Sequence, residues 1–333
     1  MLKRGSGMKF LIVGLGSMGK RRIRNLRALE VGEIIGLDLK QERCKESEEK
    51  YSIKTFSDVC CIDIADVDAI IVSTPPDHHN EWIGYAISNK KPVFVEASVI
   101  LGGLRDLNLK AKMSEVLVVP SSTLHFHPAI KIIREVVKNN QYGRVTNFSY
   151  HMGQYLPDWH PWEKIGDSYT GKKETSGARE MVAFEFTWLF DIVGFPRSIT
   201  GFYGQTVDFG PEIDDTYAIA LKFDKAFATL IVDTTSRYYI RHLVMNLERA
   251  QIVWNWDQKK VMLYEADKKA WQEILLPGGT AAEGYNQNIL EDIYVDEMRA
   301  FIEAFNGESK FPNSLDSDIR VLGLLHKVEG ELK

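Results

Sequence analysis

The sequence has little cysteine, and its three thiols are poorly placed for cross-linking. Cys44, Cys60 and Cys61 have neither the spacing of a zinc site nor that of a disulfide framework. We find no other grouping of His, Asp, Glu or Cys with ligand spacing, so we predict no bound metal. A chain that does not depend on disulfides is typical of a reducing compartment, and we expect a cytoplasmic protein.

The sequence also lacks an excess of positive charge and any long apolar run. Its 333 residues include 41 Lys and Arg against 46 Asp and Glu, a formal net charge of −5. This balance argues against nucleic acid and against an anionic membrane surface as partners. No apolar stretch approaches the roughly 20 residues that a membrane helix needs. With 44% hydrophobic residues, the chain is of ordinary globular composition, and its length suggests about two domains.

Three spaced glycines near the start predict a dinucleotide site. The segment Gly14-Leu15-Gly16-Ser17-Met18-Gly19 follows the apolar run Phe10–Val13 and leads into a helical pattern. In such a loop the first glycine permits a tight turn, and the second lets the backbone approach a pyrophosphate. The third lets helix and strand pack closely, and the helix N-terminus attracts the anion.

An acidic residue at the end of the second apolar run favours NAD. Asp38 follows Ile34–Leu37, roughly 20 residues after the glycines, where a carboxylate would bind a ribose 2′-hydroxyl. A carboxylate repels a 2′-phosphate, although Lys40 and Arg43 lie close behind and would weaken that preference. We therefore predict NAD as the cofactor, with NADP as the alternative.

The first part of the chain alternates between short β-rich runs and amphipathic segments, which is typical of βαβ units. The expected strands are Lys9–Val13, Glu33–Leu37, Ala69–Ser73, Pro92–Val95 and Val116–Val119. The expected helices are Met18–Glu30, Lys40–Lys50, His79–Asn89 and Gly103–Met113. This pattern predicts an α/β domain over residues 1–122, a Rossmann-type doubly wound parallel sheet.

The pattern beyond Pro128 predicts an α+β domain over residues 123–333. Helices are expected at Ala129–Lys138, Ala178–Val193, Ile289–Phe305 and Leu315–Glu329. Strands are expected at Val145–His151, Ser198–Thr206, Asp215–Phe223, Phe227–Asp233, His242–Leu247, Gln251–Trp256, Val261–Glu265 and Trp271–Leu275. They would form a large, mostly antiparallel open sheet. Its uncovered face leads us to expect a homodimer or homotetramer.

Together these features resemble the Gfo/Idh/MocA oxidoreductase family. The resemblance rests on the glycine fingerprint, Asp38, Ser73-Thr74-Pro75-Pro76 with His79, and Val93-Phe94-Val95-Glu96, and it extends over essentially the whole chain. It implies that Thr74, Pro75 and His79 line the nicotinamide side of the cofactor, and we include Glu96 in this site. Alternatively, His79 is a first-turn polar residue that only caps its helix.

Two signatures of that family are altered here. Glu-Lys-Pro after the fifth strand, whose lysine usually transfers the substrate's proton, is replaced by Glu96-Ala97-Ser98. A helical Asp, His and Asp at spacings of four and three become Glu180, Phe184 and Thr187, which share one helix face. Oxidation of a secondary alcohol needs a base on the hydroxyl. Another group must take the proton, or the reaction differs.

Four residues are candidates for that proton: His125, His127, His160 and Glu180. His125 and His127 would lie on one side of an extended segment, either as a proton relay or as polar residues that cap the helix from Ala129. Glu180 occupies the position of the family's first aspartate, which favours contact with substrate. It would otherwise only complement the dipole of its helix.

The segment from His151 to Trp162 is dense in aromatic and polar side chains, and we expect it to bind a carbohydrate. Rings would stack on sugar C–H faces, while carboxylate and amide groups would bind hydroxyls. The alternative is a packed loop whose tryptophans fill an interface. The predicted substrate residues are His151, Tyr155, Asp158, Trp159 and Arg179.

These observations predict an NAD-dependent oxidoreductase that acts on a sugar, nucleotide sugar or polyol by a non-standard proton path. One alternative is a redox-neutral sugar enzyme that retains NAD, similar to the family's glycosidases or to an epimerase. A second is an NAD-bound sensor without turnover. Ala97 and Phe184 keep these alternatives open.

Overall fold

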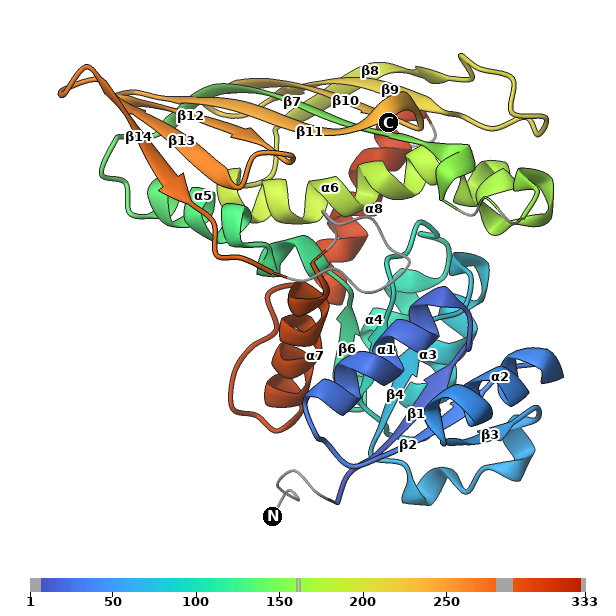
Figure 1. Ribbon diagram of the computed structural model, residues 1–333. Helices are drawn as coiled ribbons and strands as arrows, with labels where there is room; N and C mark the ends of the chain where they lie inside the picture. Colours follow the sequence, from blue (N-terminus) through green and yellow to red (C-terminus); the bar gives the residue numbers. More distant parts are fainter. Residues whose placement is uncertain (1–6, 160, 162, 280–289, 331–333) are drawn as a thin grey trace. The chain divides into compact units, whose positions relative to one another are not determined.

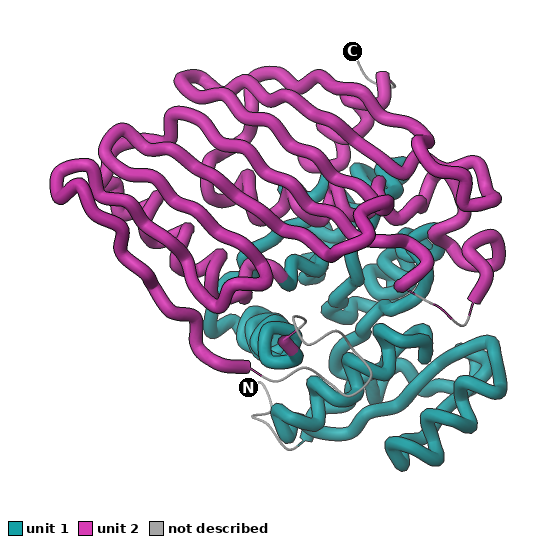
Figure 2. The backbone as a smooth tube through the Cα atoms, turned by 45° about the horizontal axis from the view of Figure 1, so that its top comes forward, with its two compact units in different colours: residues 1–123, 291–319 teal, residues 124–290, 320–333 magenta. Residues whose placement is uncertain are grey.

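The computed structural model describes residues 7–159, 161, 163–279 and 290–330, in two compact units (Figures 1 and 2). Unit 1 comprises residues 1–123 and 291–319, and unit 2 comprises residues 124–290 and 320–333. The chain therefore leaves unit 1 one residue after the expected boundary. The two units are not the two contiguous domains that we expected, because residues 291–319 return to unit 1.

Unit 1 contains a parallel six-stranded sheet, which confirms the predicted Rossmann-type fold. Its order is β3-β2-β1-β4-β5-β6. The strands are β1 (Lys9–Val13), β2 (Glu33–Leu37), β3 (Lys54–Phe56), β4 (Ala69–Val72), β5 (Val93–Val95) and β6 (Val118–Pro120). β3 was not predicted, because three partly exposed residues show no periodicity. In this topology the carboxyl ends of β1, β2, β4 and β5 meet at one edge, where ligands bind.

Five α-helices of the described chain lie wholly within unit 1. They are α1 (Ser17–Ala28), α2 (Gln41–Tyr51), α3 (His79–Ser88), α4 (Leu104–Met113) and α7 (Glu291–Phe305). α7, which we expected in the second domain, returns to unit 1 for a physical reason. Its Met298, Phe301 and Ile302 are buried in one core cluster with Phe10 and Phe94. This apolar burial holds a segment from the end of the chain on the first sheet.

Unit 2 contains an eight-stranded sheet in the order β14-β13-β12-β11-β7-β10-β9-β8. All neighbours are antiparallel except β7 and β10, which confirms a large, mostly antiparallel sheet. The strands are β7 (Val145–Tyr155), β8 (Ser198–Gly204), β9 (Thr216–Lys222), β10 (Phe227–Asp233), β11 (Thr235–Leu247), β12 (Ala250–Asn255), β13 (Lys260–Glu265) and β14 (Ala270–Leu275).

Helices cover one face of this sheet, which we call the inner face (Figure 1). α5 (Pro128–Lys138) and α6 (Gly177–Val193) contact its strands, and α8 (Leu315–Val328) crosses from unit 1 to unit 2. Tyr150 and Met152 of β7 are buried on the inner face, so the alternating residues point to the outer face. In the described part of unit 2, no helix packs on that outer face (Figure 2).

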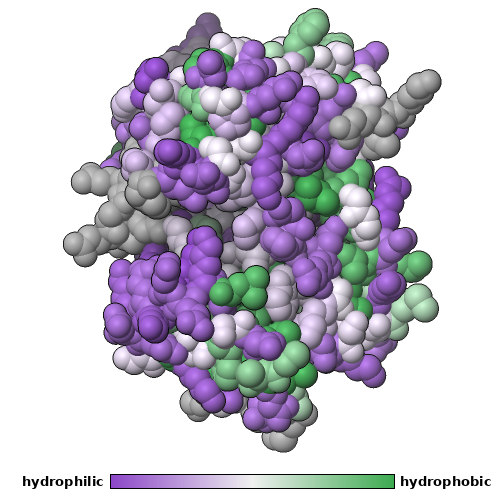
Figure 3. All heavy atoms as spheres, turned by 90° about the vertical axis from the view of Figure 1, so that its right-hand side faces the viewer, coloured by the Kyte–Doolittle hydropathy of each residue, from purple (hydrophilic) through white to green (hydrophobic). Residues whose placement is uncertain are grey.

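Among the described helices, none combines the length and apolar character needed to cross a bilayer. On the side shown in Figure 3, hydrophilic side chains predominate and hydrophobic ones gather in small patches.

Candidate functional site

The loop after β1 forms a cradle that requires glycine. Gly14 has a φ of +88°, in the left-handed region that other residues rarely adopt. A Cβ at Gly19 would lie 1.8 Å from the carbonyl oxygen of Gly14, so α1 begins directly against the turn. Ser17 and Met18 open α1, whose first turn contains no acidic residue. The N-terminal N–H groups of α1 are therefore well suited to a pyrophosphate.

Asp38 lies beside this cradle with its carboxylate held in place. Its Oδ2 accepts a hydrogen bond from the backbone N–H of Leu15 at 2.8 Å, and its Oδ1 accepts one from Lys40 N–H at 2.8 Å. Arg43 Nη1 lies 3.5 Å from Oδ2, and Arg43 is also the nearest neighbour of Gly16, at 3.7 Å from a Cβ built there. Oδ1 has a single donor and can accept a second hydrogen bond, which fits a hydroxyl of a ribose.

Two buried polar atoms without partners lie after β4, at the same edge. His79 is 1% exposed, and its Nε2 lies 2.8 Å from the carbonyl oxygen of Thr74. Burial lowers the pKa of His79 to about 4, so the neutral ring donates from Nε2 and leaves Nδ1 as an acceptor. That Nδ1 and the Thr74 hydroxyl have no hydrogen-bond partner in the described chain. A carboxamide supplies both donors and an acceptor, so a nicotinamide fits here.

Glu96, the remaining predicted cofactor residue, belongs to a buried ionic network. Its carboxylate accepts two hydrogen bonds from Arg22, at 2.7 and 2.9 Å, and a third from Ser73 Oγ at 3.3 Å. Arg22 is fully buried and also contacts Glu297 of α7 at 2.9 Å. Burial opposes its charge, but Glu96 and Glu297 together raise the pKa of Arg22 above its usual value. This network holds Glu96 rigidly at the carboxyl end of β5.

Sequence reasoning did not identify Arg22 or Glu297. Glu297 accepts hydrogen bonds from Ser121 Oγ, Ser122 N–H and Thr123 Oγ1, at 3.0, 2.7 and 2.8 Å. These contacts fix the end of β6 to α7 across more than 170 positions of sequence. The sequence offers one signal for this network: Arg22 lies in a helix that is expected to pack against a buried sheet, where its charge would need a partner.

The expected extended arrangement of His125 and His127 is wrong. Residues Thr123–Phe126 form a 3₁₀ turn, so the two rings do not alternate on one side. His127 accepts the N–H of Ala129 at Nδ1, 3.2 Å away, and thereby caps α5. Burial, reinforced by the charge of Arg241, lowers the pKa of His127 to about 3. The capping role therefore agrees with the geometry, and this ring cannot take a proton near neutral pH.

His125 and Glu180 lie at opposite ends of α6. His125 is 3% exposed, and its Nε2 lies 3.9 Å from Asp191 Oδ2, which also accepts a hydrogen bond from Arg134 Nε at 2.7 Å. Asp191 follows Glu180 by 11 residues in the same helix. At 1.5 Å per residue this separation is about 16 Å, so the two candidates do not share one site. His160 lies outside the described residues.

At its N-terminal end, α6 packs against Trp159 and carries Glu180 in its first turn. A Cβ on Gly177 would lie 3.2 Å from the Trp159 ring, which therefore packs on the first residue of α6. Gly177 and Glu180 are three residues apart and share a helix face. The Trp159 indole N–H is buried and has no hydrogen-bond partner in the described chain. Glu180, a half-buried carboxylate, lies in the first turn of the same helix.

Arg179, predicted to bind substrate, instead contributes to an internal brace. It is 6% exposed, and Nε and Nη2 donate to Glu329 at 2.7 and 3.0 Å. Glu329 also accepts the Tyr217 hydroxyl at 2.9 Å. This ion pair fixes the first turn of α6, and so holds the adjacent Glu180 in place.

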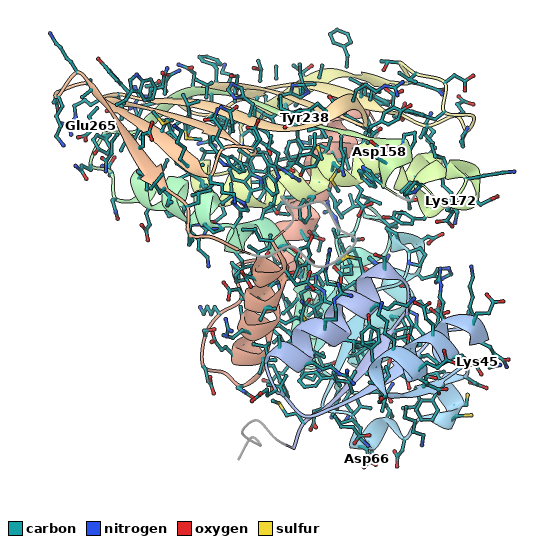
Figure 4. All side chains as sticks on the ribbon, viewed as in Figure 1. Lys45, Asp66, Asp158, Lys172, Tyr238 and Glu265 are labelled. Atoms are coloured by element: carbon teal, nitrogen blue, oxygen red, sulfur yellow. The ribbon has the colours of Figure 1, made fainter. Side chains whose placement is uncertain are left out.

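The remaining predicted substrate residues separate in space. His151 lies on the outer face of the sheet, where Nε2 is 2.7 Å from Asp233 Oδ2, so α6 and Glu180 are on the other side. Tyr155 ends β7, and the guanidinium of Arg237 lies 3.9 Å from its ring. Asp158 is exposed in the turn after β7 (Figure 4).

A known protein family matches the part of the chain that contains the parallel sheet and the glycine cradle. Residues 8–101 match the model of the Gfo/Idh/MocA family, described as "Oxidoreductase family, NAD-binding Rossmann fold". Among curated proteins, none matches the sequence of the chain.

Solved structures share the fold over nearly the full length. An oxidoreductase from Agrobacterium radiobacter, in complex with NAD+, L-tartaric acid and magnesium, superposes with a TM-score of 0.86 at 11% identity, over 98% of this chain and 96% of that one. A levoglucosan dehydrogenase in complex with NADH and levoglucosan gives 0.83 at 15% identity, over 97% and 96%. UDP-N-acetylglucosamine 3-dehydrogenase from Acidithiobacillus ferrooxidans gives 0.76 at 13% identity, over 98% and 97%.

The family match covers the strand–glycine–helix loop, Asp38, Thr74, His79 and Glu96. The parallel sheet, the glycine cradle and the orphaned polar atoms after β4 are consistent with it. Residues 8–101 are thus similar, in sequence and in fold, to the NAD-binding Rossmann domain of Gfo/Idh/MocA oxidoreductases.

Proposed function

We propose that this oxidoreductase acts on a sugar, nucleotide sugar or polyol, and that Glu180 accepts the proton of the substrate hydroxyl. The observation that carries the proposal is the position of Glu180, a half-buried carboxylate in the first turn of α6. The Trp159 ring packs on Gly177 at the start of the same helix. A carboxylate accepts the hydrogen bond of a substrate hydroxyl and can take its proton.

Different residues of the chain would bind the cofactor and transfer the proton in such a reaction. Bound NAD supplies the hydride acceptor. The glycine cradle and Asp38 would hold the pyrophosphate and ribose, while Thr74 and His79 would orient the carboxamide. Glu180 would remove the proton of the substrate hydroxyl. The Arg179–Glu329 brace keeps Glu180 in position.

The other candidates fit this role less well. Ala97 has no titratable group, and the lowered pKa of His127 prevents it from accepting a proton. His125 is buried beside the Asp191 end of α6, about 16 Å from Glu180 along the helix axis. The relatives' names support the substrate class, since levoglucosan and UDP-N-acetylglucosamine are both carbohydrates.

The substitution Glu180→Gln tests the proposal. It removes the base but preserves size, so we expect kcat to fall about 100-fold, within the range for loss of a general base. The affinity for NAD, measured by calorimetry, should stay within about twofold. Glu174→Gln, at an exposed position before the same helix, is the matched control and should retain full activity. An unchanged kcat in Glu180→Gln would remove Glu180 from the mechanism.

We also propose that the protein self-associates through the outer face of its large sheet. Eight strands about 4.8 Å apart, each with about six residues at 3.3 Å, present roughly 750 Å². A stable interface buries about 800 Å² per partner. Exposed apolar residues on this face include Phe202, Phe227, Ile231, Trp271 and Leu275. The three free cysteines are consistent with the cytoplasmic location that we propose.

A further inference from the structure

Three aromatic rings on the inner face of unit 2 form what we call the indole cluster: His127, Trp254 and Trp256. Ring centroids are 4.7 Å apart for His127 and Trp256, 5.5 Å for His127 and Trp254, and 5.8 Å for the two indoles. Trp254 is completely buried in β12, whereas Trp256 just beyond it is half-buried. The cluster therefore has a buried base and an accessible side.

The cluster contains two buried N–H donors for which the described chain supplies no acceptor. The Nε1 atoms of Trp254 and Trp256 are buried and have no partner in the described chain. His127 uses Nδ1 as the acceptor for its capping bond, so its proton is on Nε2, a third donor. Trp188 gives the contrast, because its Nε1 donates to Glu185 at 2.7 Å. A buried donor that lacks an acceptor destabilises the fold unless a ligand accepts its hydrogen bond.

A fixed positive charge lies against the same rings. The guanidinium of Arg241 is 4.6 Å from the Trp256 ring and 5.2 Å from that of Tyr239. Glu185, which is completely buried, holds Arg241 Nε at 2.9 Å and Nη2 at 2.8 Å. The same carboxylate also accepts the Tyr150 hydroxyl at 2.7 Å, so its charge is shared among several donors. Burial, and after it the charges of Arg241 and Lys131, lower the pKa of His127.

We propose that the indole cluster binds the carboxylate of an acidic sugar. A hydroxyl needs an acceptor as well as a donor, whereas a carboxylate only accepts, so it matches a set of donors beside a cation. This inference rests on the proposed sugar oxidoreductase function and narrows it to substrates of the uronic or aldonic acid type. Tyr239, also half-buried, would lie on the accessible side.

Calorimetry on the NAD-loaded protein at neutral pH tests this inference. We expect methyl glucuronoside to bind at least about tenfold more tightly than methyl glucoside, since only the former carries a carboxylate. Trp256→Phe keeps the ring but removes the N–H, and should abolish most of that preference without weakening the glucoside. Trp271→Phe, at a 48% exposed position on β14, is the control and should leave both affinities unchanged. Circular dichroism verifies that each variant is folded.

Several results would overturn the inference. Equal affinities for the two glycosides, or a preference that Trp256→Phe leaves intact, would contradict it. So would tighter binding of glucose 6-phosphate than of the glucuronoside with the same dependence on Trp256, because the site would then be a phosphate site. The experiment distinguishes a failure of the carboxylate-binding inference from a failure of the proposed oxidoreductase function. Protein that binds the acid selectively but forms no NADH from any sugar would keep this inference and lose the oxidoreductase proposal.

Discussion

At the residue scale, the chain buries two histidines as neutral rings. His79 and His127 are 1% and 5% exposed, and burial lowers their pKa values to about 4 and about 3. Each ring has one nitrogen committed to the backbone, at Thr74 O and Ala129 N respectively. The sequence placed both residues next to strand ends, but only tertiary burial distinguishes a proton carrier from a capping residue.

The substitution His127→Asn makes this burial measurable. In the unfolded chain histidine binds a proton below about pH 6.5, while the folded ring stays neutral to about pH 3. The contribution of the neutral His127 ring to the free energy of unfolding is thus fully present above pH 6.5 and is lost as the pH falls towards 3. Asparagine can cap the helix but does not titrate.

We therefore expect the His127→Asn variant to lose about 2–3 kcal/mol less stability than wild type between pH 7 and about pH 4.5. Urea unfolding at the two pH values gives this difference. His242→Asn, on a half-exposed position of β11, is the control and should follow wild type. Parallel pH profiles of the wild type and the His127→Asn variant would show that the ring is protonated in the folded state.

At the scale of elements, regular periodicity predicts the bounds of several strands. It does not reveal which residues far apart in the sequence will pair. The expected bounds of β1, β2 and β10 agree with the structure residue for residue. The Arg179–Glu329 ion pair joins residues 150 positions apart, which no local pattern reveals. For the same reason Arg179 was predicted to bind substrate and α7 to belong to the second domain.

The glycine cradle yields a prediction about an element rather than a side chain. Gly19→Ala would place a Cβ 1.8 Å from the carbonyl oxygen of Gly14, forcing α1 away from the turn. We expect NAD affinity to fall at least about 100-fold, because the N–H groups of α1 no longer converge on the pyrophosphate. Gly84→Ala, in helix α3, has its nearest neighbour at 3.5 Å and serves as the control. Calorimetric titration with NAD measures both, and equal affinities would contradict the role of the cradle.

At the scale of the whole molecule, the sheet of unit 2 has one covered and one uncovered face. Cross-strand pairing aligns Phe202, Ala218, Ile231, His151 and His242 in a row on the uncovered side. Such a surface, with the exposed apolar side chains of Phe202 and Ile231 beside histidines, is typical of an association face. The open sheet was predicted from alternation, but the placement of His151 on its outer face required the register.

Ile231→Glu tests association through this face. Ile231 is 44% exposed in the central part of the sheet, so a charge there would be buried without a partner in an oligomer. We expect light scattering after size exclusion to show an oligomer for wild type and a monomer for the variant. Leu109→Glu, 60% exposed on α4 of unit 1, should leave the oligomer intact. An oligomer that persists in Ile231→Glu would place the interface elsewhere.

We propose that this chain, which has Ala97 where the similar family has a lysine, performs net oxidation of a polyhydroxylated substrate. The most direct measurement is the number of NADH molecules formed per substrate molecule consumed, across a panel of neutral and acidic sugars, nucleotide sugars and polyols. We predict one NADH for each substrate consumed, with the rate strongly reduced in Glu180→Gln. Substrate turnover with no accumulation of NADH would contradict the account and identify a redox-neutral enzyme. NAD binding without turnover of any substrate would contradict it in favour of a sensor.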